Sequence, residues 1–151
     1  MFGDALKSAE GEPAGWITEQ TIPQVKNIYG ATKLAAEDLC RLYQRNHGLN
    51  CLTLRTSRFF PEDDDDREKR ASYSGENSKA NEFLYRRVDI EDAVDAHFCA
   101  AKRAPEMAYD HFIISATTPF DEADQNALGI DAASVVQNRF LNQKAVYEKR
   151  N

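Results

Sequence analysis

The chain has 151 residues, with 19 Lys and Arg against 25 Asp and Glu, which gives a formal net charge of −6 at pH 7. Seven Gly, three Cys and 10% aromatic residues exclude collagen-like, disulfide-rich and wholly disordered classes. No apolar run approaches the roughly 20 residues that span a bilayer, the N-terminal residues do not resemble a signal peptide, and the acidic balance argues against general nucleic-acid binding. We therefore expect a cytoplasmic, globular protein with neither a nucleic-acid nor a membrane partner.

The first part of the chain predicts a loop, a helix and a strand. Gly and Pro punctuate residues 1–27, which is typical of a loop. From Tyr29 to His47, apolar residues recur at spacings of three and four, a helical pattern that Gly48 would end. Residues 51–54 form a short apolar run typical of a buried strand. The apolar face of the predicted helix comprises Leu34, Ala35, Ala36, Leu39, Leu42 and Tyr43.

A polar segment separates this strand from a second helix and strand. Residues 61–81 include four consecutive Asp and predict an exposed loop; their spacing is not that of a calcium-binding loop, so no metal site is expected. Asp89 is the candidate N-cap of a helix that ends near Pro105, and residues 112–114 predict a strand. One face of this helix holds Val94, His97, Phe98 and Ala101.

The C-terminal part predicts a final helix. Asp131 is the candidate N-cap of a helix that runs to Leu141, and residues 145–150 form a weakly helical tail. Strands that alternate with helices favour an α/β fold.

The cysteines show no spacing of a metal site or of a redox motif. Cys40, Cys51 and Cys99 are odd in number, and each is flanked by apolar residues. We expect all three to behave as buried, small hydrophobic residues.

Tyr29 and Lys33 are the residues whose spacing suggests chemistry. They lie four positions apart, so they share one face of the predicted helix. A nearby ammonium stabilises a phenolate, which lets a tyrosine exchange protons near neutral pH, as a hydride-transfer enzyme requires. By spacing alone, however, the pair is also compatible with an ordinary surface pair.

Five segments, in order, resemble the NAD-dependent epimerase/dehydratase family of the extended short-chain dehydrogenase/reductase superfamily. Residues 2–4 resemble its V-Y-G turn, and residues 16–23 resemble its I-T-E-x-T-P loop. Residues 29–37 resemble its Y-G-x-S/T-K-x-x-x-E helix, residues 52–55 its L-R strand, and residues 88–97 its V-x-V-x-D-V-A-x-A-H helix. The resemblance implies the C-terminal part of a doubly wound, Rossmann-like parallel sheet with a small substrate-binding subdomain.

The resemblance also implies roles for individual residues. Tyr29 would be the general acid/base, and Lys33 would bind the ribose of the nicotinamide cofactor, NAD or NADP. Ser57 and Arg58 match positions that line the nicotinamide and the substrate, although an ordinary strand-end loop is the alternative for both.

Other positions concern the substrate or the fold. Arg58, Phe59 and Arg86 are candidates for substrate binding, with a packed turn and local ion pairs as the alternatives for Phe59 and Arg86. The substrate would be a carbonyl compound or an alcohol, with sugar derivatives among the candidates. Glu37 matches the family motif but is expected to be a helix-surface residue, and Arg55 is expected to be structural.

One family motif is missing from the 151 residues. The Gly-rich turn that holds the cofactor pyrophosphate needs closely spaced glycines, and no two glycines here lie within three residues of each other. The spacing of the motifs places the family's catalytic Ser/Thr before Met1. We therefore expect one truncated domain, with the last Rossmann elements in residues 1–60 and the substrate-binding subdomain and C-terminal helices in residues 61–151.

Three functional interpretations stay open. The first is an NAD(P)-dependent oxidoreductase of this family, which transfers hydride with a Tyr/Lys pair. The second is a catalytically inactive fragment or interaction module, and the third is a half-enzyme completed by another polypeptide. A homodimer through the helix from Tyr29 to His47 is expected from the resemblance, whereas the isolated chain is expected to be poorly stable and inactive.

Overall fold

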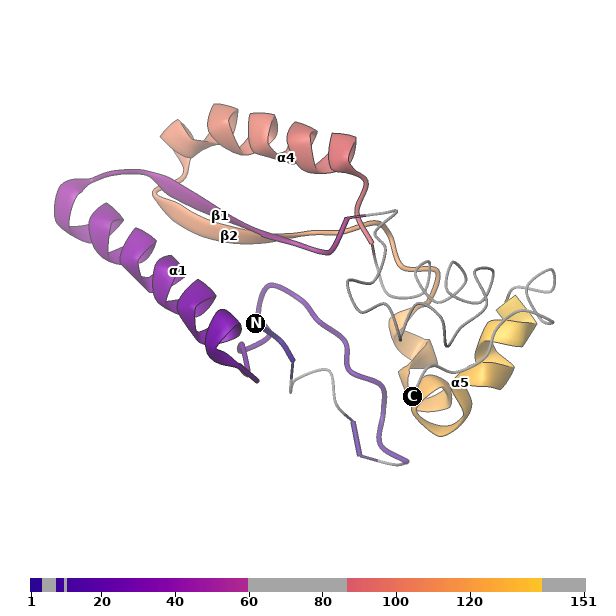
Figure 1. Cartoon of the computed structure of the whole chain (residues 1–151). Helices are drawn as coiled ribbons and strands as arrows, with labels where there is room; N and C mark the ends of the chain where they lie inside the picture. The colour runs from indigo at the N-terminus through magenta and orange to yellow at the C-terminus, as the bar shows by residue number, and fades with distance from the viewer. Residues whose placement is uncertain (4–7, 10, 60–86, 140–151) are drawn as a thin grey trace, which may run out of the picture. The chain divides into compact units, whose positions relative to one another are not determined.

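The computed structural model describes residues 1–3, 8–9, 11–59 and 87–139 (Figure 1). Its elements are α1 (Ile28–His47), β1 (Cys51–Thr56), α4 (Ile90–Arg103), β2 (Tyr109–Ile114) and α5 (Gln125–Arg139), with short 3-10 helices η1 (Ala104–Glu106) and η2 (Glu122–Asp124). The chain divides into two compact units. The first contains residues 1–7, 15–57 and 90–114, and the second contains residues 8–14, 58–89 and 115–151. The predicted division at residue 60 remains a prediction.

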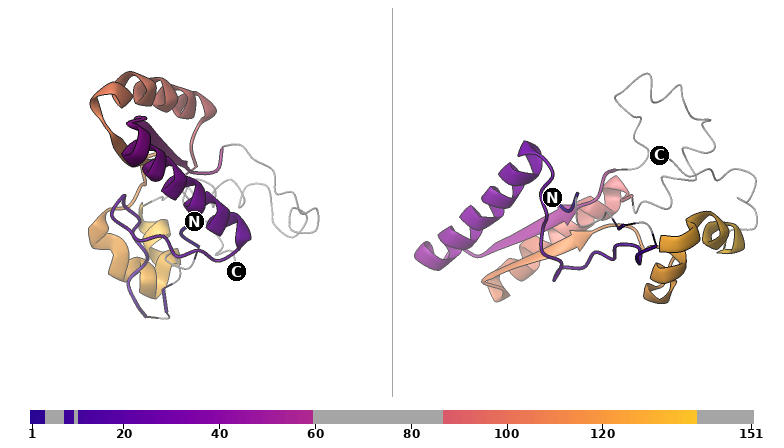
Figure 2. Two further views of the ribbon diagram at one scale, coloured as in Figure 1. Left: turned by 90° about the vertical axis from the view of Figure 1, so that its left-hand side faces the viewer. Right: turned by 90° about the horizontal axis from the view of Figure 1, so that it is seen from below.

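The first unit is built on a parallel pair of strands. β1 and β2 pair in register from Cys51 opposite Tyr109 to Thr56 opposite Ile114. Parallel strands need a crossover connection, and α4 belongs to the connection between these two. α1 and α4 cover opposite faces of the strand pair (Figures 1 and 2). This arrangement confirms the predicted α/β class and has the form of part of a Rossmann-like sheet.

The two faces of the strand pair differ in polarity because side chains alternate along each strand. Arg55 contacts α1, so its side chain lies on the face of the strand pair that points toward α1. Thr53, two residues earlier in β1, and its partner His111 in β2 lie on this same face. The face toward α4 is apolar and consists mainly of Leu52, Leu54, Phe112 and Ile114. On α4 the buried side is made of alanines, with Ala93 only 2% exposed, so this helix can lie close to the strands.

Both ends of α1 are capped. At the start, the Asn27 side-chain oxygen accepts a hydrogen bond of 2.9 Å from the backbone N–H of Gly30. At the end, Gly48 takes a left-handed conformation with a φ of 68°, and its N–H donates to the carbonyl of Gln44. The helix therefore begins one residue before the predicted start and ends where the sequence predicts.

Apart from Leu34, which is half-buried, the packed face of α1 is not the predicted apolar face. Gly30 and Glu37 are buried, whereas Leu39 and Tyr43 are 55% and 53% exposed. The physical reason is the polar character of the strand face beneath α1, which is matched by small and polar helix residues rather than by leucines. In α4, likewise, the larger apolar side chain of Phe98 is exposed.

The second unit contains α5, which is bent at Asp131. This residue has non-helical angles, and its carboxylate accepts hydrogen bonds from the backbone N–H and the hydroxyl of Ser134. The predicted cap is therefore present, although the helical segment already starts at Gln125. Val136 lies in the core of the unit, 1% exposed. A Cβ at Gly129 would collide with the carbonyl of Glu12, so glycine permits this close approach.

Several predictions fall outside the described residues. They are the acidic loop 61–81, the end of the last helix at Leu141 and the tail 145–150. None of the helices in the described part of the chain combines the length and the apolar character needed to cross a membrane.

Candidate functional site

Tyr29 and Lys33 lie together in the first turns of α1. The Lys33 Nζ atom is 5.4 Å from the centre of the Tyr29 ring, a cation–π geometry. The Tyr29 side chain is 67% exposed, and Lys33 is exposed as well. A phenol and an ammonium are thus presented side by side to any molecule that reaches this end of the helix.

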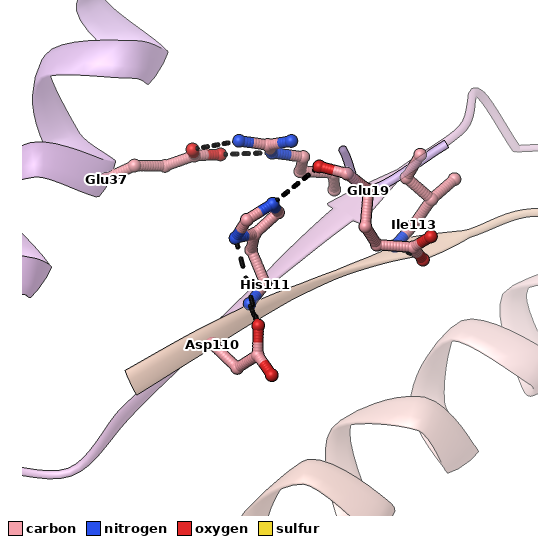
Figure 3. A network of polar contacts seen from close by, with 6 residues as sticks. Glu19, Glu37, Asp110, His111 and Ile113 are labelled. Atoms are coloured by element: carbon pink, nitrogen blue, oxygen red, sulfur yellow. Dashed lines mark hydrogen bonds and ion pairs between the residues drawn. The ribbon is translucent and has the colours of Figure 1, made fainter. Parts of the chain in front are cut away.

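Glu37 follows Lys33 by one turn and is buried, not on the helix surface as expected. Its residue exposure is 6%. The two carboxylate oxygens accept hydrogen bonds of 2.9 and 2.7 Å from Nε and Nη2 of Arg55, a bidentate pair (Figure 3). The expectation was wrong because Arg55 lies in a strand covered by α1, where its charge needs a buried partner. A charged residue in an otherwise apolar strand was the available signal.

Arg55 connects α1, β1 and the N-terminus. The hydrogen bonds that Arg55 donates to the Glu37 carboxylate, more than any other contact, raise the pKa of the Arg55 guanidinium, so this group stays charged. The guanidinium carbon also lies 5.3 Å from the centre of the Phe2 ring. These contacts are those expected of a structural residue, and they set how α1 lies on the sheet.

A second polar contact fastens the loop before α1 to β2. The Glu19 carboxylate accepts a hydrogen bond of 3.0 Å from the backbone N–H of Ile113, and the Glu19 carbonyl accepts one of 2.9 Å from Nε2 of His111 (Figure 3). Because a carbonyl oxygen can only accept, the His111 proton must reside on Nε2.

The Glu19 carboxylate is held in its charged form. The hydrogen bond from the Ile113 N–H lowers the pKa of Glu19 most, and the His111 and Arg55 side chains lower it by smaller electrostatic contributions. No local sequence pattern indicates the contact between Glu19 and His111, since the two residues are far apart along the chain and only the fold brings them together.

The remaining candidate residues are described in separate units. Ser57 is half-buried in the first unit, where its N–H donates to the Ile114 carbonyl. In the second unit Arg58 is exposed, and its carbonyl accepts from the N–H of Val88. Phe59 is 41% exposed and forms an isolated bridge with Val88. Arg86 lies outside the described residues.

The cysteines depart in part from the expectation of burial. Cys99 is exposed on α4, and Cys40 and Cys51 are half-buried. Cys99 follows the exposed Phe98 and lies outside the alanine face of α4. The apolar residues around Cys99 in the sequence did not indicate this exposure. In the described ranges of the chain, no group of three or more His, Cys, Asp or Glu is arranged to hold a metal ion.

Comparison with known families supplies the decisive observation. Residues 7–115 match the NAD dependent epimerase/dehydratase family. This segment is more than half of the 151 residues and includes α1, β1, α4 and β2. The chain belongs to this family. The resemblance drawn from the motifs is therefore confirmed, whereas comparisons with curated proteins and with solved structures gave no match.

Membership indicates an NAD-dependent, oxidoreductase-like function at the family level, together with the use of a nicotinamide cofactor.

Proposed function

We propose that this epimerase/dehydratase family member is an NAD(P)-dependent oxidoreductase that uses Tyr29 and Lys33 as its acid/base pair. The reaction would be hydride transfer to or from the carbon of a carbonyl compound or an alcohol, with sugar derivatives among the candidate substrates. The observation that carries the proposal is the exposed Tyr29 ring beneath the Lys33 ammonium, at 5.4 Å, in a chain of this family.

The proposed mechanism assigns one proton to the Tyr29 hydroxyl. When a carbonyl is reduced, this hydroxyl donates its proton to the oxygen that gains negative charge; when an alcohol is oxidised, the phenolate removes the proton. The Lys33 ammonium, which lies 5.4 Å from the centre of the Tyr29 ring, would bind the ribose of the nicotinamide cofactor, as the family resemblance implies. The nicotinamide cofactor, when bound, supplies or accepts the hydride.

The residues present suit one end of the cofactor. The hydroxyl and the ammonium on one exposed helix face can hydrogen-bond to ribose hydroxyls, so this end of α1 fits the nicotinamide riboside. The 151 residues hold no closely spaced glycines for the pyrophosphate. By family resemblance, Ser57 and Arg58 would complete the nicotinamide side.

Substrate contacts are proposed on the same basis. The guanidinium groups of Arg58 and Arg86 would favour an anionic group, and Phe59 would supply an apolar wall. The 41% exposure of Phe59 leaves part of its ring available for such contact.

The test is turnover of the full chain with NADH or NADPH and a panel of aldehydes and ketones. Tyr29→Phe removes the transferable proton and is expected to lower the rate by about 10²–10⁴-fold. Tyr43→Phe is the matched control because Tyr43 lies on the same helix and is 53% exposed, yet has no assigned catalytic role. Equal rates in Tyr29→Phe and the wild type would overturn the proposal.

The alternative is a catalytically inactive module of the same family. It is favoured by the exposed apolar side chains of Leu39, Leu42 and Tyr43 on α1. Such side chains suit association with a second copy of the chain. A wild type that forms dimers but neither binds NADH or NADPH nor turns over any carbonyl compound would support this alternative.

A further inference from the structure

Two of the three cysteines face each other between α1 and β1. Cys40 lies on the sheet-facing side of α1, one turn beyond the buried Glu37, and is half-buried. Cys51 begins β1, four residues before Arg55, so the two side chains lie on the same face of the strand. Because Arg55 contacts Glu37 on α1, Cys51 also points toward α1. The Arg41 guanidinium carbon lies 5.1 Å from the centre of the Tyr109 ring, and Tyr109 pairs with Cys51, so the turn of α1 that holds Cys40 lies over the start of β1.

We propose that Cys40 and Cys51 form a dithiol–disulfide pair, a modification site at which oxidation links α1 covalently to β1. The surrounding contacts hold both cysteines in place. The ion pair between Glu37 and Arg55 fixes the neighbouring turn of α1 on the strand, and the N–H of Cys51 donates to the carbonyl of Ala108. The two thiols can therefore react with each other within one chain, without a large movement of α1 or β1.

The oxidant required is a peroxide. One thiolate attacks a peroxide oxygen, which breaks the O–O bond and gives a sulfenic acid and, from hydrogen peroxide, one water. The second thiol attacks the sulfenic sulfur, forms the S–S bond and releases a second water. The two thiols together lose two protons and two electrons, and the peroxide is reduced.

The order of the two steps follows from the surroundings of Cys51. Burial, and then the nearby Cys40 thiol, raises the pKa of the Cys51 thiol, which keeps it protonated and makes it the slower nucleophile. Cys40 therefore attacks the peroxide, and Cys51 resolves the sulfenic acid. Oxidation is expected to accelerate as the pH rises.

Cys99 provides an internal control. It is exposed on α4, and α4 covers the opposite face of the strand pair from α1 (Figure 1). The strands thus separate Cys99 from Cys40 and Cys51, so Cys99 is expected to keep its thiol when the other two are linked.

The experiment treats the reduced full chain with hydrogen peroxide and measures its intact mass without a reductant. We expect the loss of two hydrogen atoms, one remaining titratable thiol, and a disulfide between the tryptic peptides 34–41 and 46–55. Treatment with dithiothreitol should restore the original mass. A gain of oxygen on the cysteines without this cross-link, or a cross-link to peptide 88–102, which contains Cys99, would overturn the proposal.

Two variants sharpen the test. Cys99→Ser is expected to lose two hydrogen atoms like the wild type, whereas Cys51→Ser is expected to lose none within one chain. Intramolecular loss in Cys51→Ser would show that the assigned pair is wrong. The measurement on the wild type does not depend on the folding of any variant, and because it records mass rather than turnover, it stands apart from the proposed oxidoreductase function.

Discussion

The pair of Glu37 and Arg55 shows how a single contact positions the candidate catalytic helix. Tyr29, Lys33 and Glu37 follow one another at intervals of four along α1, so the rotation of α1 about its axis that Arg55 imposes at Glu37 also decides where the Tyr29 and Lys33 side chains point. Because both partners are almost entirely shielded, neither charge has access to enough water to stand alone.

Removal of one partner should therefore be costly. Glu37→Ala is expected to lower the free energy of unfolding by about 3–5 kcal/mol, since it leaves the Arg55 charge buried and unpaired. Arg55→Ala should have a comparable effect, and the double variant should lose much less than the sum of the two. Urea denaturation of the three variants measures these differences. Additive losses would contradict a coupled pair.

The contacts of Glu19 predict that the folded chain becomes less stable in acid. The ordinary pKa of a glutamate is 4.5, and the hydrogen bond from the Ile113 N–H lowers the pKa of Glu19 in the folded chain. At pH values between the folded and the unfolded pKa of Glu19, the unfolded chain binds more protons than the folded chain does. The stabilisation by Glu19 is therefore complete above a pH of about 4.5, and it is lost as the pH falls through the folded pKa. The His111 and Arg55 side chains make smaller electrostatic contributions that lower the pKa of Glu19 in the same direction.

The check is urea denaturation at a series of pH values on either side of 4.5. Glu19→Gln keeps an oxygen for the Ile113 N–H but removes the titration, so its stability should fall less steeply on the acid side. Glu122→Gln, at an exposed residue of η2, is the matched control and should follow the wild type. A Glu19→Gln curve parallel to the wild type would contradict this assignment.

At the scale of elements, α1 and α4 both pack through small or polar residues and present larger apolar side chains to solvent. Leu39 and Leu42 on α1 are 55% and 38% exposed, and Val94 and Phe98 on α4 are 46% and 62% exposed. Apolar surface of this kind favours association, which agrees with the proposed homodimer through α1.

The dimer proposal leads to a direct test. Leu39→Glu places a charge in the expected interface and removes about 1.5–3 kcal/mol of apolar burial, so the dimer dissociation constant should rise about tenfold or more. Val94→Glu introduces the same charge at a similarly exposed site on α4 and serves as the control. Analytical ultracentrifugation measures both. Equal weakening by the two variants would argue against α1 as the interface.

At the scale of the molecule, the described sheet is small. β1 and β2 form a two-stranded parallel sheet, so one edge of β1 has no partner strand in the described part of the chain. Parallel strands are usually buried on both faces within larger sheets, and an open edge can pair with other chains.

We therefore expect the purified full chain to unfold broadly and irreversibly on heating. Differential scanning calorimetry with a second scan of the same sample is the measurement. Loss of the transition in the second scan, with light scattering from aggregates, is the expected result. A sharp, reversible transition of a monomer, with equal calorimetric and van't Hoff enthalpies, would show that the described units suffice for cooperative folding.

The amino-acid sequence by itself determined the α/β class, the family and the local pairing of Tyr29 with Lys33. Each of these depends on short-range periodicity, on capping by residues such as Gly48 and Asp131, or on motifs read along the chain. Local hydrogen bonds and helical spacing involve residues only a few positions apart, so short sequence patterns are enough to predict them.

Only the tertiary structure decided which helix faces pack and which distant residues meet. The apolar pattern of α1 suggested a leucine face toward the sheet, yet Glu37 occupies that position because Arg55 makes the facing strand surface polar. The contacts of Glu19 with His111 and Ile113 span the length of the first unit's sequence. Such contacts depend on the complementarity of two surfaces, and periodicity within one element carries no record of the surface that it will meet.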